Sequence, residues 1–289
     1  MMQAIKKLFW VSRPISWVNT AYPFAAGYLL TQHQIDPLFI IGSLFFLIPY
    51  NLMMYGVNDV FDYESDLVNA RKGGVEGALL AKKQHTMVLW SVVAINLPFI
   101  AAIVLLSSSI MSLLTFMLVL FLVLAYSAPK LRFKERPFID SMTSSMHFVG
   151  PLLFALSLSG FSVQSIVIVI GFFLWGMASH AYGAVQDILA DRSAGIGSVA
   201  TVIGARRTVW FSIALYIMSM IMIASLGGIG IIAGLINLLY IANILPFIGL
   251  TDKTAERANQ GWKRFLWINY VAGFLVTMIL LLSYMGILV

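Results

Sequence analysis

The stretch from Tyr50 to Asp66 is an apolar run that ends in a cluster of acids. Its polar side chains recur every three or four residues, at Asn51, Tyr55, Asn58, Asp59, Asp62 and Asp66. In a helix, residues at this spacing share one face, with neighbours about 5–6 Å apart. Carboxylates this close repel one another unless protons or cations neutralise them, and divalent cations prefer such oxygen ligands. The spacing therefore predicts a cation site.

A second acidic segment, from Tyr182 to Asp191, repeats the first with one residue inserted. It has the same order of tyrosine, glycine, amide and aspartate that begins at Tyr55, and its aspartates, Asp187 and Asp191, stand four residues apart. The similarity indicates an internal duplication. Two carboxylate clusters at one mouth of a cavity, each able to hold Mg²⁺, would clamp a diphosphate.

A helix end that is merely solvated would also place acids at a membrane surface. The apolar surroundings of Asn51 and Tyr55, the regular spacing and the second copy all disfavour that interpretation. Ionisable groups inside membrane helices are costly and are usually retained for function.

Several basic residues follow these clusters and could hold phosphate oxygens. They are Arg71 and Lys72 after the first cluster, and Lys130, Arg132 and Lys134 after the apolar run that ends near Ser127. The alternative is that these residues only mark the cytoplasmic side of a membrane protein. The ring faces of Tyr55 and Tyr126 could stabilise a cation formed in the reaction.

The composition places these clusters in a membrane. Of 289 residues, 60% are hydrophobic and 10% are charged, with a mean hydropathy of +0.92, far from a soluble domain. Apolar runs long enough to cross a bilayer predict about nine transmembrane helices, near residues 15–31, 38–58, 86–106, 110–127, 139–158, 164–186, 208–226, 229–249 and 265–288. The expected architecture is an all-α integral membrane protein, with two four-helix repeats plus one helix around a central cavity. We expect residues 1–289 to form a single transmembrane domain.

The positions of the charges predict the orientation. All 18 basic residues fall in or beside alternate loops of the nine-helix arrangement, which the positive-inside rule assigns to the cytoplasm. Both acidic clusters fall on that side. The net charge of +6 is thus explained by topology, without a nucleic-acid partner. The first apolar run, preceded by Arg13-Pro14, is expected to be a retained helix, and the absence of cysteine excludes thiolate chemistry.

The pattern Asn58-Asp-x-x-Asp62-x-x-x-Asp66, the later Asp187-x-x-x-Asp191 and the nine-span layout resemble the UbiA superfamily of intramembrane prenyltransferases. The resemblance implies Mg²⁺ ions bound by Asn58, Asp59, Asp62, Asp66, Asp187 and Asp191, which hold an allylic prenyl diphosphate. It also implies diphosphate contacts at Arg71, Tyr126 and Lys130. Asp59, Asp62, Asp187 and Tyr126 are the expected catalytic residues.

One branch of the superfamily is especially similar. The segment Asn69 to Ala78, the segment Tyr126 to Asp140 and the segment Arg13 to Pro23 resemble the lycopene elongases of bacterial 50-carbon carotenoid pathways. This implies transfer of dimethylallyl units to lycopene within the membrane lipid. Two alternatives remain. One is the same scaffold with an aromatic acid or quinone precursor as acceptor, and the other is a cation-coupled transporter, which the repeat disfavours because it places both clusters at one membrane face.

Overall fold

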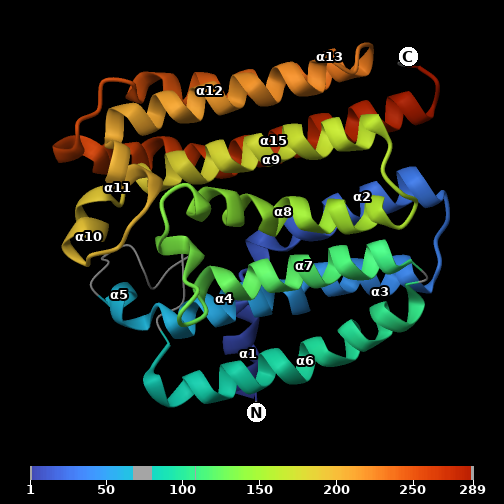
Figure 1. The fold of residues 1–289 in the computed structure, drawn as a ribbon, viewed down its shortest axis with the longest axis horizontal. Helices are drawn as coiled ribbons and strands as arrows, with labels where there is room; N and C mark the ends of the chain where they lie inside the picture. Colours follow the sequence, from blue (N-terminus) through green and yellow to red (C-terminus); the bar gives the residue numbers. More distant parts are fainter. Residues whose placement is uncertain (1, 68–79, 108, 288–289) are drawn as a thin grey trace. The chain divides into compact units, whose positions relative to one another are not determined.

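The structure is a computed structural model that describes residues 2–67, 80–107 and 109–287, and the regular elements of these residues are all helices (Figure 1). The chain divides into two compact units. Unit 1 comprises Met1–Phe133 and Met146–Phe161, and unit 2 comprises Lys134–Ser145 and Ser162–Val289. Each unit is described by itself.

Unit 1 is built around the helix that carries the first acidic cluster. Its elements are α1 (Met2–Val11), η1 (Pro14–Ser16), α2 (Trp17–Gln32), α3 (Pro37–Leu47), α4 (Pro49–Phe61), α5 (Tyr63–Leu67), η2 (Lys82–Gln84), α6 (His85–Leu106), α7 (Ile110–Ser127) and most of α8 (Ile139–Ser157). Helix α4 packs against α1, α6 and α7, and α3 packs against α2 and α6 (Figure 1).

Buried aromatic rings fill the core of unit 1. The side chains of Phe24, Phe45, Phe46, Phe116 and Phe154 are fully buried. The centres of their contacting rings lie 4.9–6.2 Å apart, which is the range in which aromatic pairs attract one another. This cluster anchors α2, α3, α7 and α8 around α4.

A break between α3 and α4 explains one polar residue of the predicted motif. Pro49 has no backbone N–H, so the hydrogen-bond ladder is interrupted there. The fully buried amide of Asn51 donates to the carbonyls of Phe46 (3.0 Å) and Leu47 (3.1 Å) and to the hydroxyl of Thr20 (2.7 Å). Asn51 therefore satisfies backbone groups at the break and joins α4 to α2.

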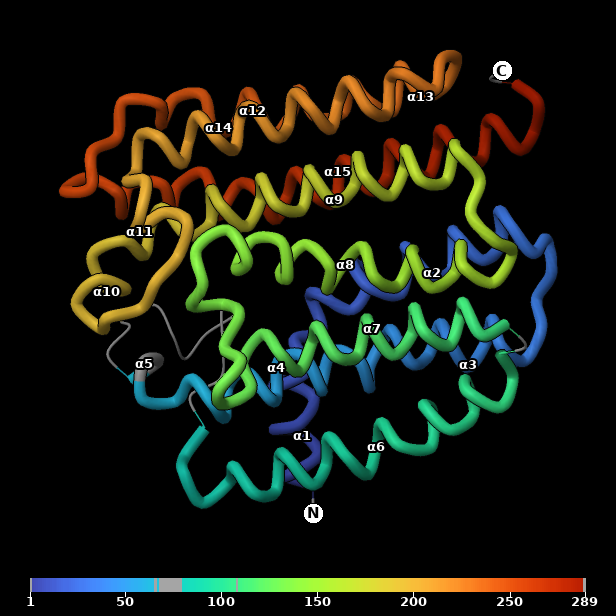
Figure 2. Tube along the Cα trace, viewed as in Figure 1, coloured from blue at the N-terminus to red at the C-terminus, as the bar shows by residue number. Residues whose placement is uncertain are grey.

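Unit 2 begins at Lys134, before α8, and contains the second acidic segment. Its elements are the start of α8, α9 (Val163–Val185), α10 (Ile188–Ser193), α11 (Val199–Ile203), α12 (Ala205–Ala224), α13 (Ile229–Leu235), α14 (Asn237–Ile244), η4 (Leu245–Phe247), η5 (Asp252–Ala258) and α15 (Asn259–Tyr284). Helices α9 and α12 run side by side over most of their length (Figure 2).

The helices agree closely with the expected membrane spans. Seven stretches of the described residues are long and apolar enough to cross a bilayer, so the chain is a multi-pass membrane protein. The two other expected spans correspond to α2 and α8, which are not among the seven. Helix α2 has only 16 residues, and α8 is less apolar because it carries Asp140, His147 and several hydroxyl residues. The count of nine spans is therefore not confirmed, although the helical architecture is.

A close contact between α8 and α9 in unit 2 leads to a stability prediction. A Cβ added at Gly176 would lie 2.3 Å from Ser145 Oγ and 3.1 Å from Ser145 Cα, whereas a Cβ at Gly273 meets nothing within 4 Å. Gly176→Ala should therefore lower the free energy of unfolding by about 1–3 kcal/mol. Gly273→Ala should leave it unchanged or raise it by about 0.5–1 kcal/mol, because alanine favours the helix.

Thermal unfolding of both variants in the same detergent checks this prediction. A Gly176→Ala protein with the wild-type midpoint would show that α8 and α9 do not pack as closely as described.

Candidate active site

The first acidic cluster lies at a corner between two helices. Helix α4 ends at Phe61, Asp62 closes its last turn by donating its backbone N–H to Asn58 (2.9 Å), and α5 starts at Tyr63. The expected continuous helix from Tyr50 to Asp66 is thus wrong at this point, because Asp62 leaves the helical conformation (φ −100°, ψ 1°). The acidic residues before and after Asp62 therefore lie on two helices, α4 and α5, and do not share one continuous helical face.

The two aspartates at this corner are almost inaccessible to solvent. Asp59 is 1% exposed and Asp62 is 3% exposed. The side-chain amide of Asn58 donates to Asp62 Oδ2 (2.5 Å) and to Ser127 Oγ at the end of α7 (2.9 Å). Burying a carboxylate is expensive unless it is hydrogen-bonded and paired with positive charge. The cluster therefore depends on nearby cations.

Arg13 provides the first of these cations. Its Nη2 lies 2.8 Å from Asp59 Oδ1, and its guanidinium lies 4.1 Å from the centre of the Tyr55 ring. Arg13 is not among the site residues predicted from the sequence. The positive-inside rule already predicts a basic residue before a membrane helix. An arginine at this position therefore does not by itself indicate a role in the site.

Arg132 provides a second cation, from the turn that follows α7. Its Nη2 lies 3.6 Å from Asp62 Oδ1, and its Nη1 donates to the carbonyl of Phe61 (3.3 Å). Arg132 was expected to face the diphosphate, and the structure places it beside the first cluster. Lys130 is in the same turn and is exposed.

Three basic residues of unit 1 have unusual backbone conformations. Arg13 (φ 50°), Lys130 (φ 73°) and Arg132 (φ 39°) adopt positive φ, which is uncommon for residues with a Cβ. Such strain costs of the order of 1–3 kcal/mol and concentrates at binding sites. The strain is consistent with loops shaped to present these side chains.

Tyr126 lies one residue before Ser127, the hydroxyl that binds Asn58. Its ring packs edge-on against His147, with 4.8 Å between ring centres. Arg71 and Lys72 lie outside the described residues, as does the side chain of Asp66. Lys134, in η3 (Phe133–Glu135), is assigned to unit 2.

The second cluster lies where α9 gives way to α10. Asp187 is the second residue after the end of α9 and occupies the N-cap position of α10, Asp191 is inside α10, and both are half-buried. Two contacts with the start of α15 fix this end of α9. Tyr182 donates its hydroxyl to the carbonyl of Ala258 (3.0 Å), and Asn259 donates its amide to Gln186 Oε1 (2.5 Å).

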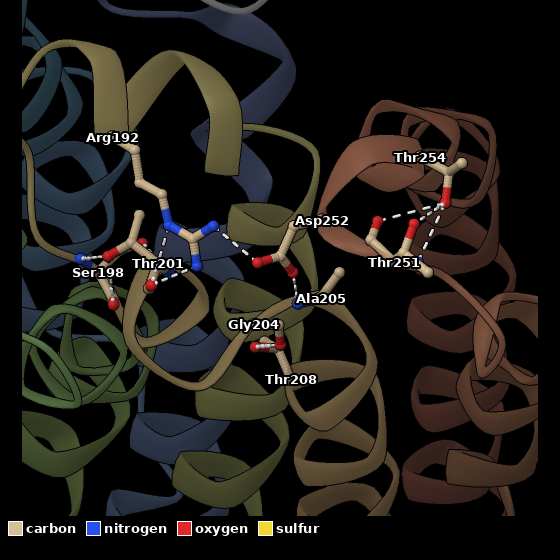
Figure 3. Close-up of polar contacts among 9 residues, drawn as sticks. All are labelled: Arg192, Ser198, Thr201, Gly204, Ala205, Thr208, Thr251, Asp252 and Thr254. Carbon is tan, nitrogen blue, oxygen red and sulfur yellow. Dashed lines mark hydrogen bonds and ion pairs between the residues drawn. The ribbon is translucent and has the colours of Figure 1, made fainter.

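Arg192 fastens α10 to the rest of unit 2. Its guanidinium donates to the carbonyl of Thr201 through Nη2 (2.7 Å) and Nε (3.2 Å), and to Asp252 Oδ2 through Nη1 (2.7 Å). Asp252 also accepts the backbone N–H of Ala205 (2.8 Å) (Figure 3). These contacts give Arg192 a structural role, since they hold the helix that carries Asp191.

The donor atoms of both clusters are carboxylate and amide oxygens, which suit Mg²⁺. Among the described residues, no three acidic or histidine side chains converge into a complete metal cage. Mg²⁺ commonly takes only one or two protein carboxylates, with waters and substrate phosphates completing its shell. The residues present therefore fit an ion that binds together with a phosphate ligand.

Comparison with known proteins agrees with these observations. Residues 20–270 match the model of the UbiA prenyltransferase family. A lycopene elongase/hydratase from Corynebacterium glutamicum is 50% identical over 283 residues, covering 97% of this chain and 98% of the relative. A C(50) beta-cyclic carotenoids biosynthesis protein, LbtBC, from a Dietzia species is 49% identical over 279 residues, covering 96% of this chain and 64% of that protein.

The fold is also that of solved structures. A UbiA homolog from Archaeoglobus fulgidus bound to DMAPP and Mg²⁺ has a TM-score of 0.64 and 19% identity, and the match covers 92% of this chain and 98% of the homolog. The residues matched by the family model, 20–270, include both acidic clusters. The chain belongs to the UbiA prenyltransferase family.

Proposed function

We propose that this protein transfers a dimethylallyl group from its allylic diphosphate to lycopene, as a step in the synthesis of 50-carbon carotenoids. The observation that carries this proposal is the 50% identity to the Corynebacterium glutamicum lycopene elongase/hydratase over nearly the full length of both chains. The matched region includes both acidic clusters. The resemblance deduced from the sequence motifs supports the same branch of the family.

The roles of the site residues follow from the charge of the reaction. In this proposal Asn58, Asp59, Asp62, Asp66, Asp187 and Asp191 hold Mg²⁺, while Arg71, Lys72, Lys130, Arg132 and Lys134 bind the diphosphate. When bound, Mg²⁺ supplies Lewis-acid stabilisation of the negative charge on the departing diphosphate. The cationic side chains add charge-assisted hydrogen bonds to the same oxygens.

The transfer itself is balanced without an oxidant or reductant. The allylic carbon–oxygen bond breaks and its electron pair leaves on the diphosphate. The π electrons of a terminal lycopene double bond then form the new carbon–carbon bond. The tertiary cation that results either loses a proton or takes up water. Tyr55 and Tyr126 are proposed to face the allylic cation, and the packing of Tyr55 against Arg13 and of Tyr126 against His147 fixes both rings.

Arg13 has a role in this proposal that the sequence motifs did not suggest. It neutralises Asp59 in the absence of substrate, and Mg²⁺, when bound, would supply further positive charge to the same carboxylate. Both clusters and the basic loops are proposed to lie on the cytoplasmic side, where soluble prenyl diphosphates are available. An aromatic acceptor is the remaining alternative.

Expression in cells that accumulate lycopene tests the proposed acceptor. We expect 45- and 50-carbon carotenoids by chromatography and mass analysis. Asp62→Asn and Asp187→Asn should each abolish them, because each removes a carboxylate that balances a metal charge. Glu64→Gln is the matched control and should retain most of the activity, because Glu64 is exposed and pairs only with the exposed Lys82 among the described residues.

Immunoblots of the membrane fraction establish that all variants are present in equal amounts. Unchanged lycopene with abundant wild-type protein would refute the acceptor assignment. Substantial product from either aspartate variant would refute the two-cluster model.

Removal of Arg13 tests its role as the resident cation. Without metal, Arg13→Ala should lower the free energy of unfolding by about 3 kcal/mol, because it removes one partner of a largely buried ion pair. Mg²⁺ with diphosphate should then stabilise the variant more than the wild type, since the added cation replaces the missing charge. Thermal unfolding in detergent, with and without Mg²⁺ and diphosphate, measures both effects.

Arg13→Lys is the control, because it keeps the charge and should lose less stability than Arg13→Ala. Equal unfolding temperatures of wild type and Arg13→Ala in metal-free buffer would contradict the proposed role.

A further inference from the structure

A cavity in unit 2 is lined by residues that do not belong to the acidic segment of that unit. It has a volume of about 330 Å³ and is lined by Pro246, Phe247, Gly249, Leu250, Thr254, Arg257, Gln260 and Arg264. The volume is at the lower end of the range for small-ligand sites, about 300–1,000 Å³. The lining combines one apolar wall, from η4 and the residues after it, with one polar wall from η5 and α15.

The polar wall is a single helical face. Arg257, Gln260 and Arg264 stand at positions i, i+3 and i+7 of the nearly continuous run formed by η5 and α15, so they lie one above another. Arg264 is held in place by two contacts. Its Nε donates to the carbonyl of Gln260 (3.3 Å), and its guanidinium lies 5.6 Å from the centre of the buried Phe247 ring.

The two arginines are not neutralised within the unit. In the part of the chain that the structure describes, neither Arg257 nor Arg264 forms an ion pair with a carboxylate. The nearby acid Asp252 is engaged by Arg192 and by the N–H of Ala205 (Figure 3). Glu256 does not line the cavity. The cavity therefore presents uncompensated positive charge beside an apolar surface.

The position of the cavity relates it to the membrane surface. The charged segment from Asp252 to Arg264 cannot enter hydrocarbon at low cost. From Phe265 to Tyr284 the sequence is predominantly apolar and long enough to span about 30 Å. On the other side of the cavity, the apolar stretch Ile229–Phe247 ends. The cavity thus lies where two membrane helices reach the headgroup region.

We propose that this cavity binds the phosphate headgroup of an anionic phospholipid. Arg257 and Arg264 bind the phosphate oxygens, and Gln260 and Thr254 supply further hydrogen bonds. Pro246 and Leu250 contact the glycerol and the upper acyl chain. Guanidinium groups suit this task because their N–H donors match two phosphate oxygens at once, and basic pockets at the ends of membrane helices recognise anionic headgroups in this way.

Lipid titration of the purified full-length protein tests the proposal. Native mass spectrometry in detergent would measure binding of phosphatidylglycerol and phosphatidylcholine, with inorganic phosphate as a competitor. We expect a clear preference for phosphatidylglycerol, and we expect the double variant Arg257→Gln/Arg264→Gln to reduce its affinity about tenfold or more. The matched control is Lys253→Gln/Lys263→Gln, which removes the same charge from the same segment outside the cavity lining and should reduce the affinity far less.

A space-filling variant separates the cavity from general surface charge. A Cβ at Gly249 meets no atom within 4 Å, although Gly249 lines the cavity. Gly249→Leu should therefore fold normally and weaken phosphatidylglycerol binding without changing the charge. Gly273→Leu, at another open glycine, should not weaken it. These variants decide the question if the double arginine variant fails to fold.

Three results would overturn the proposal. The first is equal loss of lipid in the arginine and lysine double variants, which would indicate surface charge alone. The second is wild-type binding by Gly249→Leu. The third is displacement of the lipid by inorganic phosphate at comparable concentration, which would identify a site for free phosphate.

Discussion

The constraint on which unit 1 depends is the cost of keeping carboxylates inside an apolar protein. Asp59 and Asp62 are almost fully buried at the corner between α4 and α5. Each would be expensive to hold in its charged form without compensation, and Arg13 and Arg132 approach them from two different segments of the chain. The arrangement joins the N-terminal segment, α4 and the turn after α7 through charge. In the proposed function, Asp59 and Asp62 would hold Mg²⁺ in addition to these arginines.

Unit 2 stabilises its acidic segment in another way. Asp187 and Asp191 are half-buried, and the helix that carries Asp191 is held by Arg192, which contacts the backbone of Thr201 and the side chain of Asp252. The basic residue next to the motif therefore serves the scaffold. The two clusters are similar in sequence, yet the first uses its arginines at the carboxylates and the second uses its arginine to fix a helix.

The helices and the two acidic clusters could be predicted from the sequence. Membrane spans must be long and apolar, and acids within them are costly. The helix ends were located within a few residues for α6, α7 and α9. The two aspartate motifs and the layout of the spans together predicted the family. The break at Asp62 was missed, since helical periodicity extends through it and nothing local marks a corner.

Other features depend on contacts between residues far apart in the chain. Arg13 and Asp59 are separated by 46 residues, and no local pattern indicates which of many basic residues reaches a given acid. Asn51 was interpreted as part of a polar functional face, but the structure uses its amide to satisfy carbonyls at the α3–α4 break. The buried location of Asn51 agrees with the prediction. Its hydrogen-bond partners could be identified only in the folded chain.

In the proposed function, both clusters bind one metal–diphosphate complex. Calorimetry of the purified protein with an unreactive analogue of dimethylallyl diphosphate tests this most directly. The account predicts that the analogue binds only with Mg²⁺ present, that Mg²⁺ binds weakly by itself, and that Asp62→Asn and Asp187→Asn each abolish the joint binding. Equally tight binding of the analogue in a chelator, or undiminished binding by either variant, would contradict it.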